Sequence, residues 1–401
     1  MQMTCTQKQL VRGLSIVNRA VATRTTQPIL THILLEAGEN GLRLVATNLE
    51  ISVQCWIEAD VQQAGAATVP ARLLTDFVRS LPDEPVSLAY KPDTQTMHVR
   101  CARMDAKIKG MAAADFPAVP HMPDAGVPLD LEAMQPALDV ELDNLSVSRM
   151  IDQVAFAAST DTFRPALSGI LTQWQNGRFS LAATDGYRLC VRAMPLPSDS
   201  QAPADMQLII PAKSFMEVAK ISGESDRTQP IRLYMQDREK AQLLFGMQGL
   251  ANGVQRIEVA TQLINASFPS YQAIVPTTHK TRMVVPTEAL HQAIRIASLF
   301  AKDNANRVQV QVSRSDDHTI GMRIVSADGE QGTTVNELEA DVSGPDIDIA
   351  FNAQYLLDLL TQVLEEEIVI EASEKTRPCA LYPQGQNKDD FLYVVMPMHT
   401  R

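Results

Sequence analysis

The chain has 401 residues, of which 45% are hydrophobic, a share that supports packed cores and excludes a disordered polypeptide. At roughly 150 residues per domain, this length predicts two or three domains. Lys and Arg total 35 against 47 Asp and Glu, so the formal net charge is −12, which disfavours nucleic-acid binding unless the basic residues gather on one surface.

The five cysteines are scattered without a CxxC pair, a pattern that disfavours both a disulfide framework and a zinc site. Reduced thiols favour a cytoplasmic location. The first residues lack the apolar core of a signal peptide, and no apolar run approaches the ~18 residues that a membrane span needs. We therefore expect a soluble cytoplasmic protein with no membrane partner.

Apolar residues at helical spacing predict a first helix over 7–22, with Leu10, Leu14, Val17 and Val21 on one face. Alternating runs of β type follow it, and similar runs recur twice further along the chain. Each contains a turn signal, at Thr47–Asn48, Asp185–Gly186 and Asp328–Gly329. The same periodicity predicts helices over 70–81, 147–158, 211–222, 287–301 and 352–364.

Three helix starts are alike and recur at equal intervals along the chain: VPARLLTDFVRSL from Val69, IPAKSFMEVAKIS from Ile210 and FNAQYLLDLLTQV from Phe351. Pro70 and Pro211 suit the first helical position, and Asn352 suits the N-cap. A repeat at this spacing predicts three homologous α+β domains. We place them at 1–125, 126–280 and 281–401, with the proline-rich stretch from Ala118 to Ala137 as a linker or surface insertion.

The predicted helices carry nine Lys and Arg against five Asp and Glu, although the whole chain is acidic. In the first helix, Lys8, Arg12, Ser15 and Arg19 form one stripe. These charges are either ordinary solvated helix faces or one basic surface that holds phosphates without reading sequence. Aromatic residues are only 5% of the chain, which disfavours a base-stacking platform for single strands.

Motifs of catalysis are missing from the sequence. The seven histidines are dispersed without HExxH, and GxGxxG, P-loop and GxSxG patterns do not occur. Asp161 and Asp185 could form a carboxylate pair, but nothing places an acid, a base and an oxyanion donor together. We expect a protein that is not an enzyme and that needs no metal or other cofactor.

The order of several motifs resembles the bacterial DNA polymerase III beta subunit family, the replicative sliding clamps. The motifs are TQPILTHILLEA, ATNLEISV, TVPAR, AADFP, ATDGYRL, FPSYQAIVP, FNAQYLLDLL and YVVMPM, and together they span nearly the whole chain. The resemblance implies three clamp-type domains per chain and a head-to-tail homodimeric ring with helices lining the pore. Such a ring encircles double-stranded DNA and tethers the catalytic subunit of DNA polymerase III, clamp-loader subunits and other proteins through short peptides.

Helix packing gives a separate argument for two chains. Twelve helices spaced 8–10 Å apart on a circle leave a bore of roughly 21–28 Å, whereas six leave about 5–9 Å. A DNA duplex is at least ~17 Å across. Two chains are therefore the smallest ring that admits it. The alternative is a repeat-built peptide-binding scaffold that does not encircle DNA.

The resemblance also implies site residues. Arg24, Arg72 and Lys213 match family positions that touch DNA, and helical spacing alone adds Lys8, Arg12 and Arg149. Ser298, Leu299 and Phe300 match the family's dimer interface, although the two apolar residues could instead belong to the core. A hydrophobic peptide cleft between the second and third domains would be formed by Leu167, Thr184, Gly186, Leu189, Pro269, Ile274, Val394, Met396, Pro397 and Met398, with Arg164, Tyr187 and Arg188 at its edge.

The alternative hypothesis is that these residues form no cleft. In that case Leu167, Leu189 and Val394 are ordinary core residues, and Asp185–Gly186 is only a turn. Flexible, polarizable methionines favour the cleft, because they adapt to varied ligands. The chain departs from the family pattern at Ala273, where a basic residue is common, and at its end, His399-Thr400-Arg401. This ending leaves open which side chain closes the far end of the cleft.

Overall fold

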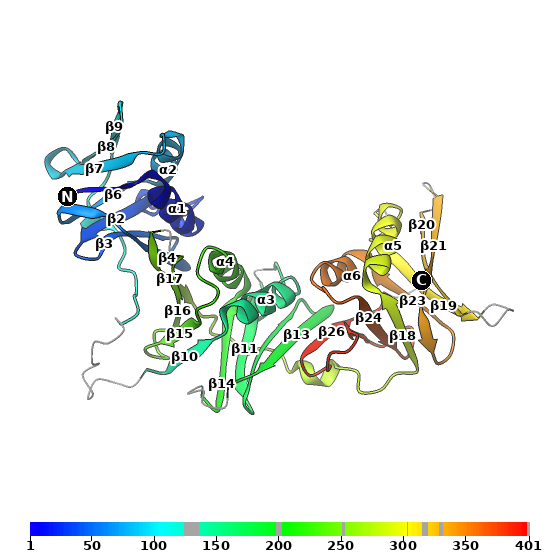
Figure 1. The fold of residues 1–401 in the computed structure, drawn as a ribbon. Coiled ribbons are helices and arrows are strands. Elements are labelled where there is room, and N and C mark those ends of the chain that lie inside the picture. The colour runs from blue at the N-terminus through cyan, green and yellow to red at the C-terminus, as the bar shows by residue number, and fades with distance from the viewer. Residues whose placement is uncertain are drawn as a thin grey trace. The chain divides into compact units, whose positions relative to one another are not determined.

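The computed structural model describes residues 1–123, 136–161, 163–197, 203–250, 253–302, 304–314, 320–328 and 332–398. All six predicted helices are confirmed within these ranges, with ends that differ by a few residues (Figure 1). The first predicted helix ends early, since its last turn is a 3-10 helix over Asn18–Ala20. The helices are α1 (Gln7–Val17), α2 (Ala71–Ser80), α3 (Asn144–Ala155), α4 (Ala212–Ser222), α5 (Thr287–Leu299) and α6 (Ala353–Leu360).

The same order of elements occurs three times: a strand, a helix, a run of strands, a second helix and three more strands. The sequence did not predict the strand before each first helix, because that strand is short and runs almost directly into the helix. The strands of the first repeat are β1 (Gln2–Thr6), β2 (His32–Gly38), β3 (Gly41–Thr47), β4 (Ile51–Ile57), β5 (Asp60–Gln63), β6 (Gly65–Pro70), β7 (Pro85–Lys91), β8 (Thr96–Cys101) and β9 (Met104–Lys109).

The second and third repeats follow the same plan. The second contains β10 (Leu138–Leu142), β11 (Gly169–Gln175), β12 (Arg178–Thr184), β13 (Arg188–Pro195), β14 (Asp205–Pro211), β15 (Ile231–Met235), β16 (Gln242–Gln248) and β17 (Val254–Gln262). The third contains β18 (Thr281–Pro286), β19 (Arg307–Arg314), β20 (Ile320–Asp328), β21 (Gly332–Glu339), β22 (Asp341–Ser343), β23 (Ile347–Asn352), β24 (Glu367–Ala372), β25 (Cys379–Pro383) and β26 (Phe391–Val395). Of the third predicted turn, Asp328–Gly329, Asp328 is the last residue of β20, and Gly329 lies outside the described residues.

The antiparallel sheets cross from one repeat into the next. An eight-stranded sheet has the order β10-β15-β16-β17-β4-β3-β2-β6, so strands of the first and second repeats share it. A nine-stranded sheet, β14-β11-β12-β13-β26-β25-β24-β18-β22, joins the second and third repeats. A five-stranded sheet, β5-β1-β7-β8-β9, belongs to the same compact unit as the eight-stranded sheet, and a four-stranded sheet, β21-β20-β19-β23, to the unit of the nine-stranded sheet.

The helix starts differ in one respect from the prediction. Pro70 and Pro211 are the last residues of strands, and each helix begins at the following alanine. Pro70 has ψ 118°, which is not helical, so the proline stands at the N-cap position. Asn352 caps α6 as predicted, because its side chain accepts a hydrogen bond from the amide of Gln354 at 2.9 Å.

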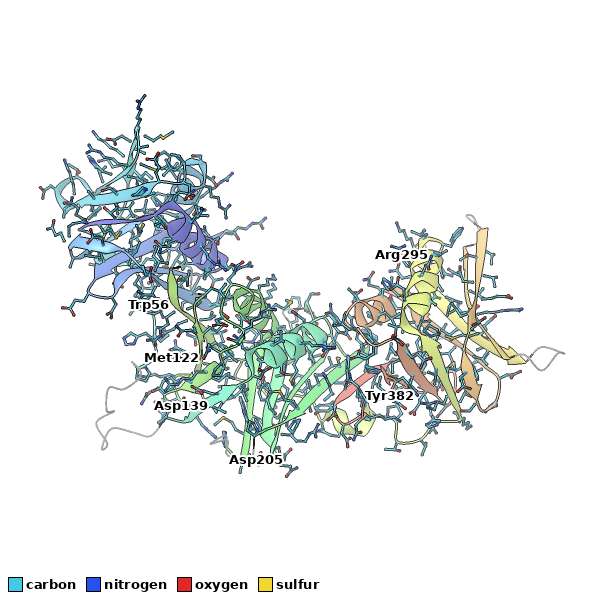
Figure 2. All side chains as sticks on the ribbon, viewed as in Figure 1. Trp56, Met122, Asp139, Asp205, Arg295 and Tyr382 are labelled. Carbon is cyan, nitrogen blue, oxygen red and sulfur yellow. The ribbon has the colours of Figure 1, made fainter. Side chains whose placement is uncertain are left out.

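The stretch after Ala118 was predicted to be a linker or a surface insertion, but its first residues contact the sheet. Met122 is 2% exposed, and its amide donates to Glu258 Oε2 at 3.2 Å. Gln54, on β4, donates to the carbonyl of Pro120 at 2.7 Å. Figure 2 labels Met122. The first part of the linker is therefore hydrogen-bonded to β4 and β17 of the eight-stranded sheet. Residues 124–135 lie outside the described ranges.

Candidate peptide-binding surface and basic helices

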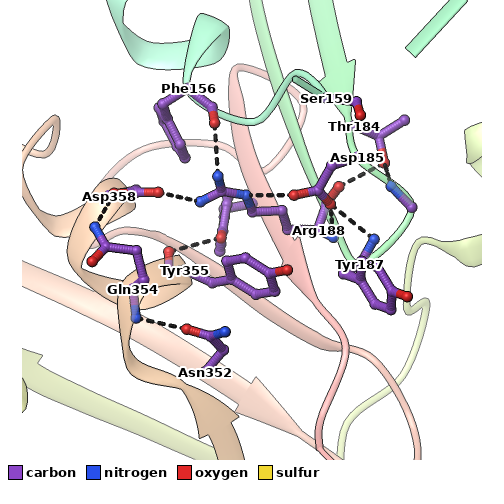
Figure 3. A network of polar contacts seen from close by, with 12 residues as sticks. Phe156, Ser159, Thr184, Asp185, Tyr187, Arg188, Asn352, Gln354, Tyr355 and Asp358 are labelled. Atoms are coloured by element: carbon purple, nitrogen blue, oxygen red, sulfur yellow. Dashed lines mark hydrogen bonds and ion pairs between the residues drawn. The ribbon is translucent and has the colours of Figure 1, made fainter. Parts of the chain in front are cut away.

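The turn between β12 and β13 is held by its own side chains (Figure 3). Thr184 Oγ1 donates to the carbonyl of Arg188 at 2.6 Å and accepts from the amide of Gly186 at 3.1 Å. Asp185 Oδ1 accepts from the amides of Tyr187 and Arg188 at 2.9 and 3.0 Å. Gly186 has φ +94°, a conformation that favours glycine. The turn is thus fixed in shape and leaves the Tyr187 side chain 63% exposed.

The strand that ends in Met-Pro-Met lies directly beside this turn. β13 and β26 pair Leu189 with Val394, and both side chains are buried. One residue beyond the strand, the amide of Met396 donates to the carbonyl of Tyr187 at 2.9 Å. The Met396 side chain is 38% exposed. Two motifs from distant parts of the sequence therefore form one continuous surface.

The FPSYQAIVP motif covers the same face of the sheet. Tyr271 and Val275 pack against the buried cluster that contains Leu189 and Val394. Ile274 lies between them on a short 3-10 helix and is 46% exposed. We call the following set the peptide surface: the exposed Arg164, Gly186, Tyr187, Pro269, Ile274 and Met396, the half-buried Pro397 and Met398, and the buried Leu167, Thr184, Leu189 and Val394.

Arg164 reaches the turn from another direction. A Cβ built on Gly186 would meet Arg164 Nη1 at 3.8 Å, so the guanidinium lies beside the turn. Leu167 is 8% exposed, and its amide donates to the carbonyl of Arg164 at 3.0 Å. At the far end of the surface, the amide of Met398 donates to the carbonyl of Ala350 on β23 at 2.7 Å. The predicted influence of residues 399–401 lies outside the described residues.

Arg188 does not edge this surface as predicted, because its side chain is only 9% exposed. Its guanidinium bonds Asp185 Oδ2 at 3.0 Å, Asp358 Oδ2 at 2.5 Å and the carbonyl of Phe156 at 2.8 Å (Figure 3). It also lies 4.6 Å from the ring centroid of Tyr355. Burial opposes the positive charge, but the hydrogen bond to Asp358 and the neighbouring acids outweigh it and raise the pKa of Arg188.

Asp358 and Tyr355, which hold Arg188, were missed by sequence reasoning. Both lie on α6, a helix without Lys or Arg. The single acid on that helix was a signal for an ion pair, but nothing in the sequence indicated which cation it binds, since Arg188 belongs to a different repeat. Arg188 is therefore a buried link between the β12–β13 turn and α6.

The residues predicted to touch DNA form two groups, of which the first is exposed. Arg72 and Lys213 occupy the second position of α2 and α4, and both side chains are exposed. Arg72 is 96% exposed and 3.7 Å from Asp76, a weak contact. Arg24, after the 3-10 helix that follows α1, and Arg149, on α3, are also exposed.

The basic residues of the stripe predicted on the first helix form ion pairs with acidic residues. Lys8 Nζ lies 2.5 Å from Asp83 Oδ2 at an exposed site. Arg12 binds Glu224 at 3.2 Å, just after α4. Arg19 binds Glu217, on α4, at 3.2 Å. Counting charges along the helix could not reveal these pairs, so the stripe is less basic than predicted, and Arg12 connects α1 to the end of α4.

The residues predicted at the dimer interface lie at the end of α5. Leu299 is 58% exposed, so it is not a core residue. Phe300 is half-buried and caps the helix, with its amide bonded to the carbonyl of Ala297 at 3.1 Å. Ser298 Oγ donates to the carbonyl of Arg295, which Figure 2 labels. The contact of these residues with a second chain stays a prediction.

The described ranges offer neither a membrane-spanning helix nor a metal site. No helix there is both long and apolar enough to span a membrane. No cluster of three or more His, Cys, Asp or Glu in the same residues could hold a metal ion. The five cysteines are unpaired and buried, and burial raises the pKa of the Cys55 thiol to about 12, which leaves it unreactive at neutral pH.

The fold is that of the DNA sliding clamps. The clamp from Bacillus subtilis shares 24% sequence identity with this chain, covers 100% of both chains and superimposes with a TM-score of 0.86. The beta subunit from Pseudomonas aeruginosa gives 24% identity, 100% coverage of both chains and a TM-score of 0.85. Both comparisons match three α+β domains with antiparallel sheets.

The chain belongs to the DNA polymerase III beta subunit family. Family models match it in three consecutive parts: the N-terminal domain at residues 1–120, the central domain at 141–270 and the C-terminal domain at 272–399. The beta sliding clamp of Synechocystis is 29% identical over 99% of both chains, and that of Staphylococcus aureus is 26% identical over 100% of both. The function of the chain is that of a DNA sliding clamp.

Proposed function

We propose that two copies of the chain close head to tail into a ring around double-stranded DNA, with the helices lining the pore. The ring acts without catalysis: it tethers the polymerase and other DNA-processing proteins, which bind the peptide surface through short linear segments. The domains of each chain are those placed at 1–125, 126–280 and 281–401. One observation carries this proposal, the way in which successive repeats share strands.

Successive repeats are joined by one type of strand pair. β4 is the third strand after the first helix of its repeat. It pairs with β17, the final strand of the second repeat. β13, the corresponding strand of the second repeat, pairs with β26, the final strand of the third. The remaining equivalent strands are β21 and β9, and each lies at the outer edge of its sheet in the described structure. Pairing β21 of one copy with β9 of another continues the pattern and closes a ring.

Helix contacts follow the same pattern. Where the first and second repeats meet, α1 and α4 are joined by Arg19 and Glu217. Where the second and third meet, Gln153 of α3 donates to the carbonyl of Gln362, after α6, at 3.4 Å. The pair left over is α5 of one copy with α2 of another. Each carries an exposed leucine near that expected contact, Leu299 at 58% and Leu73 at 55%, and such apolar surface favours association.

The two unpaired edge strands also carry opposite charges. β9 presents the exposed Lys107 and Lys109, whereas β21 presents the exposed Glu337 and Glu339. Unpaired strand edges offer free backbone hydrogen-bonding groups, and charges of one sign keep identical edges apart. Opposite charges favour pairing between β9 and β21 over pairing of either strand with its own copy.

A ring of this kind needs contacts with DNA that do not depend on the base sequence. Lys8, Arg24, Arg72, Arg149 and Lys213 are exposed cations suited to that role, because phosphate contacts position DNA without reading its sequence. Lys8 and Arg12 are the weaker candidates, since Asp83 and Glu224 already pair with them.

The proposal is tested by the mass and shape of the protein in solution. A closed dimer has twice the 44.0 kDa chain mass and scatters as an annulus. A monomer at all accessible concentrations would contradict the ring and leave the peptide-binding scaffold as the function. A dimer without a central hole would contradict it as well.

A further inference from the structure

The turn between β3 and β4 repeats the turn of the peptide surface. Thr47 Oγ1 donates to the carbonyl of Ile51 at 3.0 Å and accepts from the amide of Leu49 at 3.0 Å. These are the two bonds that Thr184 makes in the turn between β12 and β13. Leu49 has φ +74°, where the other turn has glycine at φ +94°. The first and second repeats therefore carry the same turn.

The strand next to this turn is also repeated. The amide of Gln262, at the end of β17, donates to the carbonyl of Glu50 at 3.0 Å. Met396 donates to Tyr187 in the same way, at 2.9 Å, in the peptide surface. The strand registers agree as well, since Ser52 pairs with Ala260 where Leu189 pairs with Val394.

A cavity of about 110 Å³ lies at this second turn. Ligand pockets for drug-sized molecules measure about 300–1,000 Å³, whereas an apolar cavity of about 150 Å³ holds one benzene. The cavity therefore has room for a single side chain. Residues Pro117–Pro120 form part of its lining, as residues of the FPSYQAIVP segment pack beside Leu189 and Val394 at the peptide surface. The lining residues that determine its chemistry are Glu50, Ser52, Gln242, Ala260 and Gln262.

The chemistry of this cavity differs from that of the peptide surface. The buried pair at its floor is Ser52 and Ala260 rather than two large apolar residues. Ser52 is 5% exposed, and its hydroxyl makes no hydrogen bond to any described residue. Glu50 is the only ionisable residue of the lining, is exposed, and makes no ion pair within the described ranges. A hydroxyl that can accept a hydrogen bond, beside a carboxylate without an ion pair among the described residues, favours a hydrogen-bond donor, and the carboxylate favours one with positive charge.

We propose that this cavity, named here the second site and lined by Glu50, Ser52, Ala260 and Gln262, binds a short linear peptide through a lysine or arginine side chain. The ammonium or guanidinium group donates to the Ser52 hydroxyl and to the Glu50 carboxylate. That the ligand is a peptide rests on the proposed function. That its side chain is positively charged rests on the residues that line the cavity. A peptide anchored by leucine or methionine suits the peptide surface instead.

The experiment uses the full-length protein labelled at the isoleucine δ1 methyl groups and observed by NMR. Ile51 lines the second site, and Ile274 belongs to the peptide surface, so each site has its own reporter. The probe is the tripeptide acetyl-Ala-Lys-Ala-amide, and acetyl-Ala-Glu-Ala-amide is its matched control. The lysine peptide is expected to shift Ile51 with a millimolar dissociation constant and to leave Ile274 unmoved, while the glutamate peptide shifts neither.

Three variants separate binding from folding. Glu50→Gln is expected to weaken the lysine peptide about 2- to 5-fold, the range of an exposed ion pair. Glu39→Gln makes the same charge change in the β2–β3 turn, outside the lining, and is expected to change nothing. Ser52→Ala is expected to weaken binding about 10-fold, since a hydrogen bond to a charged group is lost. Its thermal midpoint should not fall, because the hydroxyl has no partner in the described structure.

The proposal is overturned if Ile51 does not respond to the lysine peptide, if the glutamate peptide shifts it equally, or if Glu50→Gln and Glu39→Gln behave alike. These outcomes leave the ring untouched, because the solution mass reports ring closure separately. Conversely, a monomeric protein whose Ile51 still responds to the lysine peptide would refute the proposed ring and retain the second site.

Discussion

Reversing the charge of one edge strand should open the proposed ring. Lys107 and Lys109 are both exposed on β9, and the variant Lys107→Glu with Lys109→Glu places two acids opposite Glu337 and Glu339 of the other copy. Attraction between exposed charges is worth about 0.2–1 kcal/mol per pair, and like charges facing each other across strands cost a similar amount. Losing two attractions and gaining two repulsions amounts to about 1–4 kcal/mol per interface.

This change raises the dissociation constant of the interface by roughly 5- to 700-fold, since about 1.4 kcal/mol is tenfold. The value lies toward the lower end because Glu337 also bonds Arg323 of its own chain at 2.9 Å. Sedimentation equilibrium at low and high salt measures it. The effect should shrink at about 0.5 M salt, where the Debye length falls below about 5 Å.

Two further variants make the result specific. Adding Glu337→Lys with Glu339→Lys to the reversed chain restores opposite charges and should restore the dimer. Arg238→Glu with Lys240→Glu makes the same double reversal in the loop between β15 and β16 and should leave the dissociation constant unchanged. The edge-pairing argument is refuted if the reversed β9 variant dimerises normally, or if the fourfold variant dimerises no better than the double one.

Three other predictions concern the sites. Asp358→Ala leaves the buried Arg188 without its closest acid and should lower the free energy of unfolding by about 3–5 kcal/mol in urea denaturation; a loss below about 1 kcal/mol would contradict the buried link. Met396→Ala with Met398→Ala should weaken binding of a polymerase peptide in a fluorescence titration while the solution mass stays dimeric, and unchanged affinity would count against the peptide surface. Reversing the charges of Arg24, Arg72 and Lys213 together should reduce retention on DNA without altering dimerisation, so equal retention would remove these residues from the pore.

Local structure was largely predictable from the sequence. Helix periodicity located all six helices, and the Asp185–Gly186 signal located a turn whose geometry depends on those residue types. Asn352 was predicted as a cap for a local reason, because its side chain can reach the amide of the nearby Gln354. Such features depend on a few neighbouring residues, and the sequence contains them all.

Features that join distant segments were not predictable in the same way. Arg188 and Asp358 have no sequence signal that pairs them, and the acids that neutralise Arg12 and Arg19 belong to the second repeat rather than the first. The sharing of sheets between repeats also needs the fold, because strand order depends on which edges meet. For the peptide surface, only the resemblance to a known family brought ATDGYRL, FPSYQAIVP and YVVMPM together before the structure did.

The most direct test of encirclement compares circular with cut DNA. The protein is loaded onto a nicked circular plasmid by its own clamp loader, and the complex is passed through a gel-filtration column before and after a restriction enzyme linearises the plasmid. A closed ring stays with the circle and is lost from the linear form, because it slides off the free ends. Equal retention on both forms, or on neither, would contradict a ring that surrounds the duplex.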